Sequence, residues 1–413
     1  MLLPLAVPAK AGFTLRMACT VVLKPSKQAT FLARHPWVLA KSLCSSEVAP
    51  QDGDEVDLIL PNGRWLARGM YNSKSHIRVR LYSWRAGEAL DTTFWRERIR
   101  SAVKLRHDLG LDAPQAASRL IFSEADGLSG LIVDRYAQYL VVQVTAKVIA
   151  AHREAWLQPL LELTNPRGVI CRTDAKIAQA EGMQPGDEHL WGESLPEELE
   201  IVEHGLRYRV DLAAGQKTGG YLDQRENHRA AAAYASGRRV LDVCCYVGGF
   251  ALAAARLGAA ASVLGIDSSQ RAIDEARRNA ETNEIANVQF ETGECFEKLD
   301  ALRSTGEKFG MVILDPPRFA GSRHSIDQAL RAYHRLNRLG VELLEEDGIL
   351  VTCSCSGRVN RHEFQRMLGG VSQKCGRDIQ VLEQRGAAPD HPYRIGCPET
   401  EYLKCFICRV PKG

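Results

Sequence analysis

The chain has 413 residues, of which 45% are hydrophobic and 25% are charged, as in globular proteins with two to four domains. This composition excludes a disordered or fibrous chain, and no apolar run reaches the roughly 18 residues of a membrane-spanning helix. Residues 1–16 lack the basic region of a signal peptide, and Met17 is a candidate start. The 12 cysteines are scattered, which favours a reduced, cytoplasmic protein over a disulfide-stabilised one.

Charge divides the chain into three segments, which we take as predicted domains. Residues 17–96 carry 11 Lys and Arg against 7 Asp and Glu, residues 97–204 carry 11 against 17, and residues 205–413 carry 29 against 26. A basic excess of this size permits contact with nucleic acid but does not require it.

The first segment is predicted to form short strands. Residues 55–60 and 64–69 flank a Pro-Asn-Gly turn, which predicts a hairpin. Residues 77–82 alternate, so that Arg78, Arg80 and Tyr82 face away from the apolar positions. A small β-barrel with a basic outer strand face fits this pattern, and such modules commonly bind RNA. A merely solvated strand face is an equally good interpretation.

The second segment predicts a small α+β domain with a spacer or positioning role, because its negative charge argues against a nucleic-acid surface. Its expected elements are a helix at 94–109, strands at 131–134 and 139–144, a helix at 150–163 and a strand at 168–172. Residues 184–196 are rich in Gly and Pro and predict a boundary.

The third segment alternates strands with longer helices, which predicts a parallel sheet covered by helices on both faces. Strands are expected at 239–243, 262–266, 288–291, 311–314, 349–355, 379–382 and 403–409, and helices at 250–257, 272–283, 328–344 and 361–368.

The first of these strands ends in a predicted cofactor loop. Asp242 stands near its tip, and the loop through Tyr246, Gly248 and Gly249 lets the backbone approach a ligand. An acid here repels a pyrophosphate and attracts the ammonium of a methionine moiety. Asp267 follows Gly248 by 19 residues and suits a ribose diol.

Glu294 follows the third strand, where it and Phe296 would bracket an adenine. Together these features resemble the S-adenosylmethionine fingerprint of Rossmann-like methyltransferases. A nicotinamide cofactor is the main alternative, because Asp267 also suits its ribose, but the G-x-G-x-x-G motif is missing. The Gly-rich loop at 215–225, with Thr218 and Tyr221, suits a flap over a ligand, or equally a surface turn.

Two further strand ends carry the predicted chemistry. Asp315 precedes two prolines and Phe319, so that a rigid acid and an aromatic ring would meet a planar base. Cys355 ends the fifth strand at the edge where this fold binds ligands, whereas Cys353 lies deeper and is expected to pack as a small hydrophobe. C5 of cytosine is a poor nucleophile until a thiolate adds at C6, and Cys355 suits that role. A buried structural thiol is the alternative.

Metal binding is not expected. Cys405 and Cys408 have C-x-x-C spacing, but they lie in one apolar strand where positions three apart face opposite sides. No second pair stands at the distance of a zinc ribbon.

Several motifs resemble the bacterial 23S ribosomal RNA cytosine-5 methyltransferases that carry an N-terminal PUA domain. The resemblance runs from about Met17 to the end of the chain, through residues 34–38, 63–69, 217–225, 315–317 and 354–357. It implies a PUA domain, a middle α+β domain and a Rossmann-like class I methyltransferase domain that binds S-adenosylmethionine. The family's nucleophile falls on Cys355, and Asp315 would orient the cytosine.

The expected partner is 23S ribosomal RNA or an assembly intermediate of the large subunit, without a membrane, and a homodimer is compatible with the sequence. A guanine-N2 or uracil-5 RNA methyltransferase remains an alternative, because D-P-P-x-F serves several nucleobase atoms. A non-catalytic RNA-binding assembly factor is the alternative from a different class.

Overall fold

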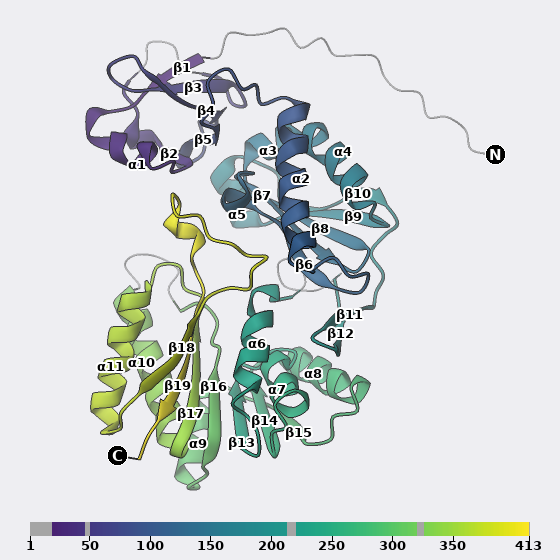
Figure 1. Ribbon diagram of the computed structural model, residues 1–413, viewed down its shortest axis with the longest axis vertical. Coiled ribbons are helices and arrows are strands. Elements are labelled where there is room, and N and C mark those ends of the chain that lie inside the picture. Colours follow the sequence, from purple (N-terminus) through teal and green to yellow (C-terminus); the bar gives the residue numbers. More distant parts are fainter. Residues whose placement is uncertain (1–18, 46–49, 213–219, 320–325, 413) are drawn as a thin grey trace, which may run out of the picture. The chain divides into compact units, whose positions relative to one another are not determined.

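The computed structural model describes residues 19–45, 50–212, 220–319 and 326–412, which form two compact units, 1–90 and 91–413 (Figure 1). Within those described ranges, no helix combines the length and the apolarity needed to cross a bilayer. Each unit is described by itself.

The first unit is built on a five-stranded sheet of order β1-β3-β4-β5-β2. The predicted hairpin is confirmed, since β3 and β4 pair antiparallel around the Pro-Asn-Gly turn. Val38, Val56 and Val79 are fully buried in its core. Its elements are β1 (Cys19–Val22), α1 (Gln28–Leu32), β2 (Trp37–Leu39), β3 (Glu55–Ile59), β4 (Trp65–Tyr71) and β5 (Ile77–Ser83).

The prediction that β5 exposes a basic face to solvent is wrong for two of its three residues. Arg78 is partly exposed, but Arg80 and Tyr82 are buried, at 7% and 1% exposure. Arg80 lies opposite Trp37 of β2, so β5 is flanked by β4 and β2 and is not an open edge. Alternation within one strand could not reveal this neighbour.

The second unit begins with α2, whose first turn is capped by Asp91: the side chain accepts a 3.0 Å hydrogen bond from the Phe94 N–H. A five-stranded sheet of order β10-β9-β8-β7-β6 follows. Its elements are α2 (Thr92–Asp108), β6 (Ala117–Phe122), β7 (Leu131–Tyr136), β8 (Tyr139–Val144), α3 (Lys147–Ala151), α4 (Arg153–Thr164), β9 (Gly168–Thr173), α5 (Ala175–Glu181) and β10 (Gly186–Gly192).

The boundary predicted at 184–196 falls on β10, which pairs antiparallel with β9 and so belongs to the sheet. The Gly residues that suggested a linker stand at the two ends of this strand. The hairpin β11 (Leu199–Glu203) and β12 (Leu206–Val210) comes next, and its turn contains the expected division at 204. The division of 91–413 into a middle and a methyltransferase domain stays a prediction.

The remaining strands form a seven-stranded sheet of order β15-β14-β13-β16-β17-β19-β18 (Figure 1). The first five strands in this order are parallel, as predicted, but β19 runs antiparallel to β17 and β18, so the sheet is mixed. The strands are β13 (Arg239–Val243), β14 (Ser262–Asp267), β15 (Val288–Thr292), β16 (Phe309–Leu314), β17 (Leu344–Ser354), β18 (Gln380–Arg385) and β19 (Lys404–Val410).

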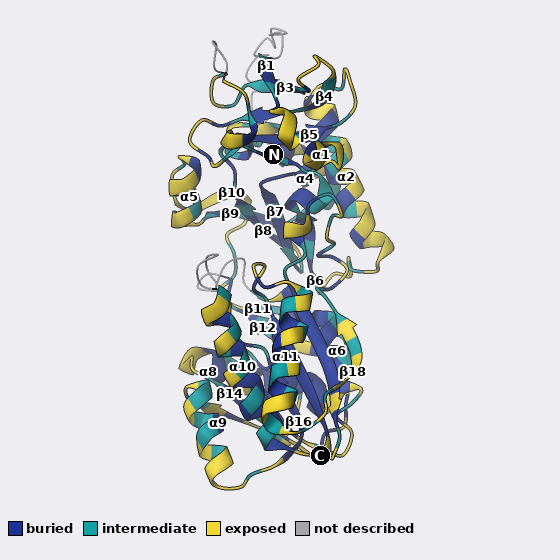
Figure 2. Ribbon diagram, turned by 90° about the vertical axis from the view of Figure 1, so that its left-hand side faces the viewer, coloured by how far each residue is buried: buried dark blue, intermediate teal, exposed yellow. Residues whose placement is uncertain are grey.

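Helices cover both faces of this sheet, and Figure 2 shows the central strands buried while the outer sides of the helices are exposed. Alternate residues of β13 supply the two layers, Val240 to one and Leu241 to the other. The helices are α6 (Arg225–Ala232), α7 (Gly249–Arg256), α8 (Gln270–Thr282), α9 (Cys295–Ser304), α10 (Ile326–Leu343) and α11 (Arg361–Cys375). The sequence analysis did not predict α6 and α9.

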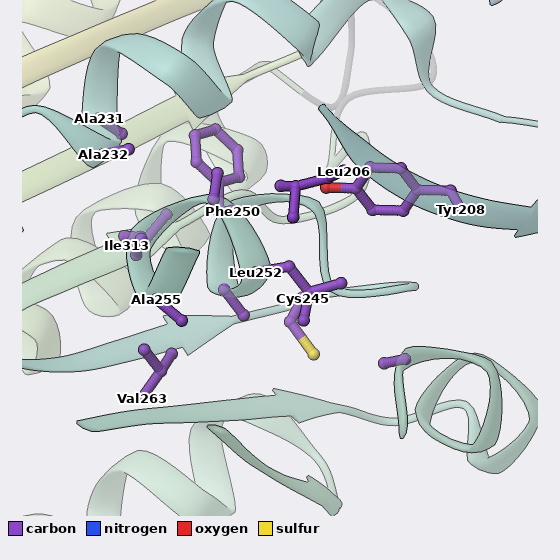
Figure 3. Close-up of a cluster of buried hydrophobic side chains, with 14 of the residues drawn as sticks. Leu206, Tyr208, Ala231, Ala232, Cys245, Phe250, Leu252, Ala255, Val263 and Ile313 are labelled. Atoms are coloured by element: carbon purple, nitrogen blue, oxygen red, sulfur yellow. The ribbon is translucent and has the colours of Figure 1, made fainter. Parts of the chain in front are cut away.

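One layer lies between the sheet, α6, α7, α8 and the hairpin β11–β12. Figure 3 shows Phe250, Leu252 and Cys245 gathered near Leu206 and Tyr208 of β12. The same buried cluster includes residues of β7 and β8, so the five-stranded and the seven-stranded sheets of the second unit share a continuous core. This shared core holds the loop after β13 in a fixed position relative to the five-stranded sheet.

Candidate active site

The loop after β13 has an unusual backbone. Cys244 and Tyr246 have φ values of +63° and +49°, and Gly248 has φ +89°. Left-handed conformations cost non-glycine residues about 1–3 kcal/mol and cluster at functional sites. At Gly249 a Cβ atom would lie 2.4 Å from the His228 ring. The backbone therefore comes closer here than any side chain would permit.

Asp242, near the end of β13, is fully buried, and neither of its carboxylate oxygens has a hydrogen-bond partner in the described part of the chain. Burial, reinforced by the charge of Asp315, raises the pKa of Asp242 to about 7. A buried carboxylate without donors is costly. An ammonium group placed beside it would supply them, so this position fits the amino group of a methionine moiety.

Asp267, the last residue of β14, fixes the loop. Its Oδ2 atom accepts a 2.9 Å hydrogen bond from the Tyr246 N–H, and its Oδ1 atom accepts one of 2.9 Å from the Ser269 N–H. Each carboxylate oxygen retains a lone pair for a further donor. The residue therefore suits a ribose diol while it holds the loop.

A cavity of about 660 Å³ lies beside this loop, lined by Tyr221, Tyr246, Gly249 and Asp315 among the predicted site residues. The rings of Tyr221 and Tyr246 meet edge to face, with centroids 5.1 Å apart. Tyr221 keeps 43% of its surface exposed. Two segments far apart in the sequence thus form one wall of the cavity.

Among the predicted cofactor residues, Asp242, Gly248, Asp267 and Glu294 are absent from the cavity lining. Glu294 is exposed at the N-cap of α9, and the Arg335 guanidinium lies 4.5 Å from the Phe296 ring centroid. Thr218 lies outside the described residues. The adenine contacts proposed for Glu294 and Phe296 therefore stay predictions.

Asp315 follows β16, and its N–H donates a 3.2 Å hydrogen bond to the Val243 carbonyl, which joins it to the end of β13. Desolvation and the charge of Asp223 raise the pKa of Asp315 to about 7, against a hydrogen bond from Gln224 that lowers it. A carboxyl group of this kind is available at neutral pH both as an acid and as a carboxylate.

Cys355 comes directly after β17, and its sulfur lies 3.9 Å from the Pro316 carbonyl, next to Asp315. Cys355 is partly exposed, whereas Cys353 is fully buried opposite Cys405 of β19. The structure thus brings the two predicted catalytic residues to neighbouring strand ends. Phe319, expected as a stacking surface, packs against Tyr333, with ring centroids 4.8 Å apart.

The sequence analysis missed a partly buried ion pair of the cavity. His228 of α6 places Nδ1 2.7 Å from Glu203 Oε1, and both residues line the cavity. Burial alone would favour the neutral imidazole, but Glu203 raises the pKa of His228. Only the fold brings these residues together, so no local pattern identified them.

Comparisons with known proteins agree with this geometry. A model for S-adenosylmethionine-dependent methyltransferases matches residues 163–366, and a model for PUA-like domains matches residues 21–84. The ribosomal RNA large subunit methyltransferases I of Erwinia tasmaniensis and Escherichia coli K12 are each 36% identical over 396 residues, covering 95% of this chain and 100% of theirs. The chain belongs to the ribosomal RNA large subunit methyltransferase I family.

Solved structures support the same fold for this chain. A candidate SAM-dependent methyltransferase from Streptococcus mutans superposes with a TM-score of 0.81 at 20% identity, covering 95% of this chain and 100% of that one. SMU.776, a candidate methyltransferase solved with SAH, gives a TM-score of 0.82 at 21% identity, covering 96% and 100%. The predicted class I methyltransferase fold with an N-terminal PUA-like domain is confirmed.

The cofactor is S-adenosylmethionine, as predicted. The buried, unpartnered carboxylate of Asp242 and the loop held by Asp267 fit its amino and ribose groups. The assignment of individual residues to it is a proposal.

Proposed function

We propose that this enzyme methylates C5 of a cytosine in 23S ribosomal RNA, with Cys355 as a covalent nucleophile. The names of its relatives support large-subunit ribosomal RNA as the substrate. The observation that carries the choice of atom is the placement of a partly exposed thiol, Cys355, 3.9 Å from the carbonyl that follows Asp315. Methylation of a nitrogen atom needs no such thiol.

S-adenosylmethionine, when bound, supplies an electrophilic methyl group. Asp242 would hold its amino group, Asp267 its ribose, and Tyr221 and Tyr246 would enclose it. Because the cavity reaches Asp315, the base would enter from the side of the β16 and β17 strand ends. The rings of Tyr221 and Tyr246 would shield one side of the reacting atoms from water.

The first step that the protein's own residues perform is the attack of the Cys355 thiolate on the base. The thiolate of Cys355 forms a bond to C6, which moves electron density to C5 and makes it nucleophilic. After C5 has been methylated, it loses its proton, the C6–S bond breaks, and the electron pair returns to sulfur. Asp315, with its pKa of about 7, would donate a hydrogen bond to N3 in its protonated form and so favour addition.

The PUA-like unit and the cellular site complete the proposal. We assign RNA binding to the PUA-like unit, on the evidence of its family match, and the large-subunit particle or its RNA as the partner. The twelve cysteines, all within the described ranges, form no disulfide, which agrees with a proposed place in the cytoplasm, where ribosomal subunits are assembled in bacteria. A homodimer stays a prediction.

Trapping tests the covalent step. Transcripts of 23S RNA carrying 5-fluorocytidine should form a stable adduct, because fluorine cannot leave C5 as a proton does. Mass spectrometry should locate the adduct at Cys355, and Cys355→Ser should abolish it while Cys353→Ser keeps it. The absence of an adduct, or an adduct elsewhere, would refute the proposal.

The product distinguishes the alternatives. Mapping methylated cytosines in ribosomal RNA from a deletion strain and its parent should show one lost 5-methylcytosine. Retained transfer in Cys355→Ser would indicate guanine-N2 methylation, and 5-methyluridine in the product would indicate uracil-5 methylation. Failure to bind S-adenosylhomocysteine in calorimetry would favour a non-catalytic assembly factor.

A further inference from the structure

Lys404 is a buried lysine beside the end of β17 that the mechanism above does not use. It is the first residue of β19 and lies directly opposite Ser354, the residue before Cys355. Only 2% of its surface is exposed. The antiparallel strand that pairs with β17 therefore brings a cation to the predicted nucleophile.

The ammonium group of Lys404 is held by neutral partners. Its Nζ atom donates hydrogen bonds to the Ser356 carbonyl at 2.7 Å and to the Tyr402 carbonyl at 2.8 Å. No carboxylate lies within 4.0 Å of it among the residues that the structure describes. An ammonium without an anion is costly to bury, and burial lowers the pKa of Lys404 to about 8. A buried charge of this kind needs an explanation.

The charges around Lys404 point to Cys355. A negative charge on Cys355 is the strongest electrostatic influence that favours the ammonium form, followed by Glu401. Arg361 and Arg318 oppose it, but Arg361 is paired with Glu401 at 2.9 Å, so these two charges largely cancel. The attraction between sulfur and ammonium therefore remains.

Among the residues that the structure describes, two tyrosines are further neighbours of Cys355. Tyr221 and Tyr333 face it, and the charge of a thiolate contributes to the raised pKa values of both, about 12. The Pro316 carbonyl accepts from the thiol and so favours its protonated form. Lys404 and the exposed Arg318 supply the positive charge that favours the thiolate form.

We propose that Lys404 is a positioning residue that favours the thiolate form of Cys355 and fixes the Cys355–Ser356 backbone through its hydrogen bond to the Ser356 carbonyl. This inference rests on the proposed function, in which Cys355 is the nucleophile. A nearby cation favours a thiolate because the charged form gains their attraction, most strongly where water is excluded. The proton that leaves sulfur passes to solvent, and no other bond changes.

Alkylation of Cys355 tests this directly in the full-length enzyme. The rate of iodoacetamide modification is measured against pH by mass spectrometry of the peptide that contains Cys355, with the exposed Cys44 as an internal standard. In Lys404→Met, modification at pH 7 should slow about tenfold, as expected for a shift of one pH unit, and should reach the wild-type rate near pH 10. Lys404→Arg should stay close to the wild type, because it keeps the charge.

Unchanged affinity for S-adenosylhomocysteine shows that the Met variant is folded. If it does not fold, the wild-type profile decides: half-maximal modification at or above the ~8.5 of an ordinary thiol overturns the inference. An identical profile in a folded Lys404→Met variant overturns it too. The 5-fluorocytidine adduct separates the two proposals, since a Lys404-dependent alkylation profile without an adduct refutes only the proposed function.

Discussion

The carboxylate of Asp267 accepts a 2.9 Å hydrogen bond from the backbone N–H of Tyr246, which ties the end of β14 to the loop after β13. Tyr246 has φ +49°, a conformation that the loop would not keep without support. The same carboxylate is the predicted acceptor for a ribose. One side chain therefore shapes the loop after β13 and is proposed to bind the ribose of the cofactor.

Asp267→Asn should weaken binding of S-adenosylhomocysteine at least tenfold. The amide nitrogen would face either the Tyr246 or the Ser269 N–H, so that one loop hydrogen bond is lost. Isothermal titration calorimetry measures the effect. Asp300→Asn is the control, because Asp300 forms surface ion pairs on α9. A dissociation constant within twofold of the wild type for Asp267→Asn would contradict this role.

Binding of the cofactor should depend on pH through Asp242. The carboxyl must be ionised to attract an ammonium, and its raised pKa of about 7 means that ionisation rises as the pH increases through 7. Affinity should therefore increase about tenfold from pH 6 to pH 7.5. Because Asp315 interacts with it, the measured midpoint belongs to the pair.

The Asp242→Asn variant should bind the cofactor weakly, and its affinity should change little between pH 6 and pH 7.5. Calorimetric titrations at five pH values check both statements. A wild-type affinity that stays flat from pH 6 to pH 7.5 would show that Asp242 does not meet the amino group.

Gly248→Ala should destabilise the protein more than Gly306→Ala. Both glycines have left-handed φ values, +89° and +75°, which cost an alanine about 1–2 kcal/mol. A Cβ atom at Gly248 would also lie 3.1 Å from the Phe290 ring, whereas nothing lies within 4 Å at Gly306. Urea unfolding of both variants measures the difference in the free energy of unfolding, which reports the steric contact with Phe290. Equal decreases in the two variants would mean that the Phe290 ring moves to accommodate the methyl group.

Asp390→Ala should reduce the free energy of unfolding by about 3–5 kcal/mol, because it leaves buried charges unpaired. Asp390 is fully buried, accepts a 2.9 Å hydrogen bond from the Arg119 N–H and pairs with Arg225 at 3.1 Å. The exposed pair of Glu162 and Arg96 is the control, and Glu162→Ala should cost less than 1 kcal/mol. A loss below 1 kcal/mol for Asp390→Ala would contradict the network.

Asp390 should also make the stability of the fold depend on pH in the acid range. Burial favours the neutral acid, but His391 and Arg225 hold the pKa of Asp390 well below its usual range. A lowered pKa stabilises the fold above the unfolded value of about 3.9, and this stability is lost as the pH falls below it. Wild-type stability should thus decline more steeply from pH 4 to pH 2 than that of Asp390→Asn.

The amino-acid sequence alone predicted most of the sheet and the site residues at its edge. The predicted strands end within one residue of Asp242, Asp267 and Asp315, and in a parallel sheet such ends share one edge. The predicted strands at 239–243 and 262–266 agree with β13 and β14 to within one residue. Local periodicity and strand direction suffice for this inference.

Only the tertiary structure decided the surroundings of these residues. Antiparallel pairing of β19 with β17 brings Lys404 opposite Ser354, and Asp390 joins Arg119 of β6 to Arg225 of α6. Such contacts join positions 50 to 271 residues apart, which local patterns do not encode. Periodicity reports which face of an element is apolar, but the partner on that face, and hence the charge beside a buried group, depends on how the elements pack.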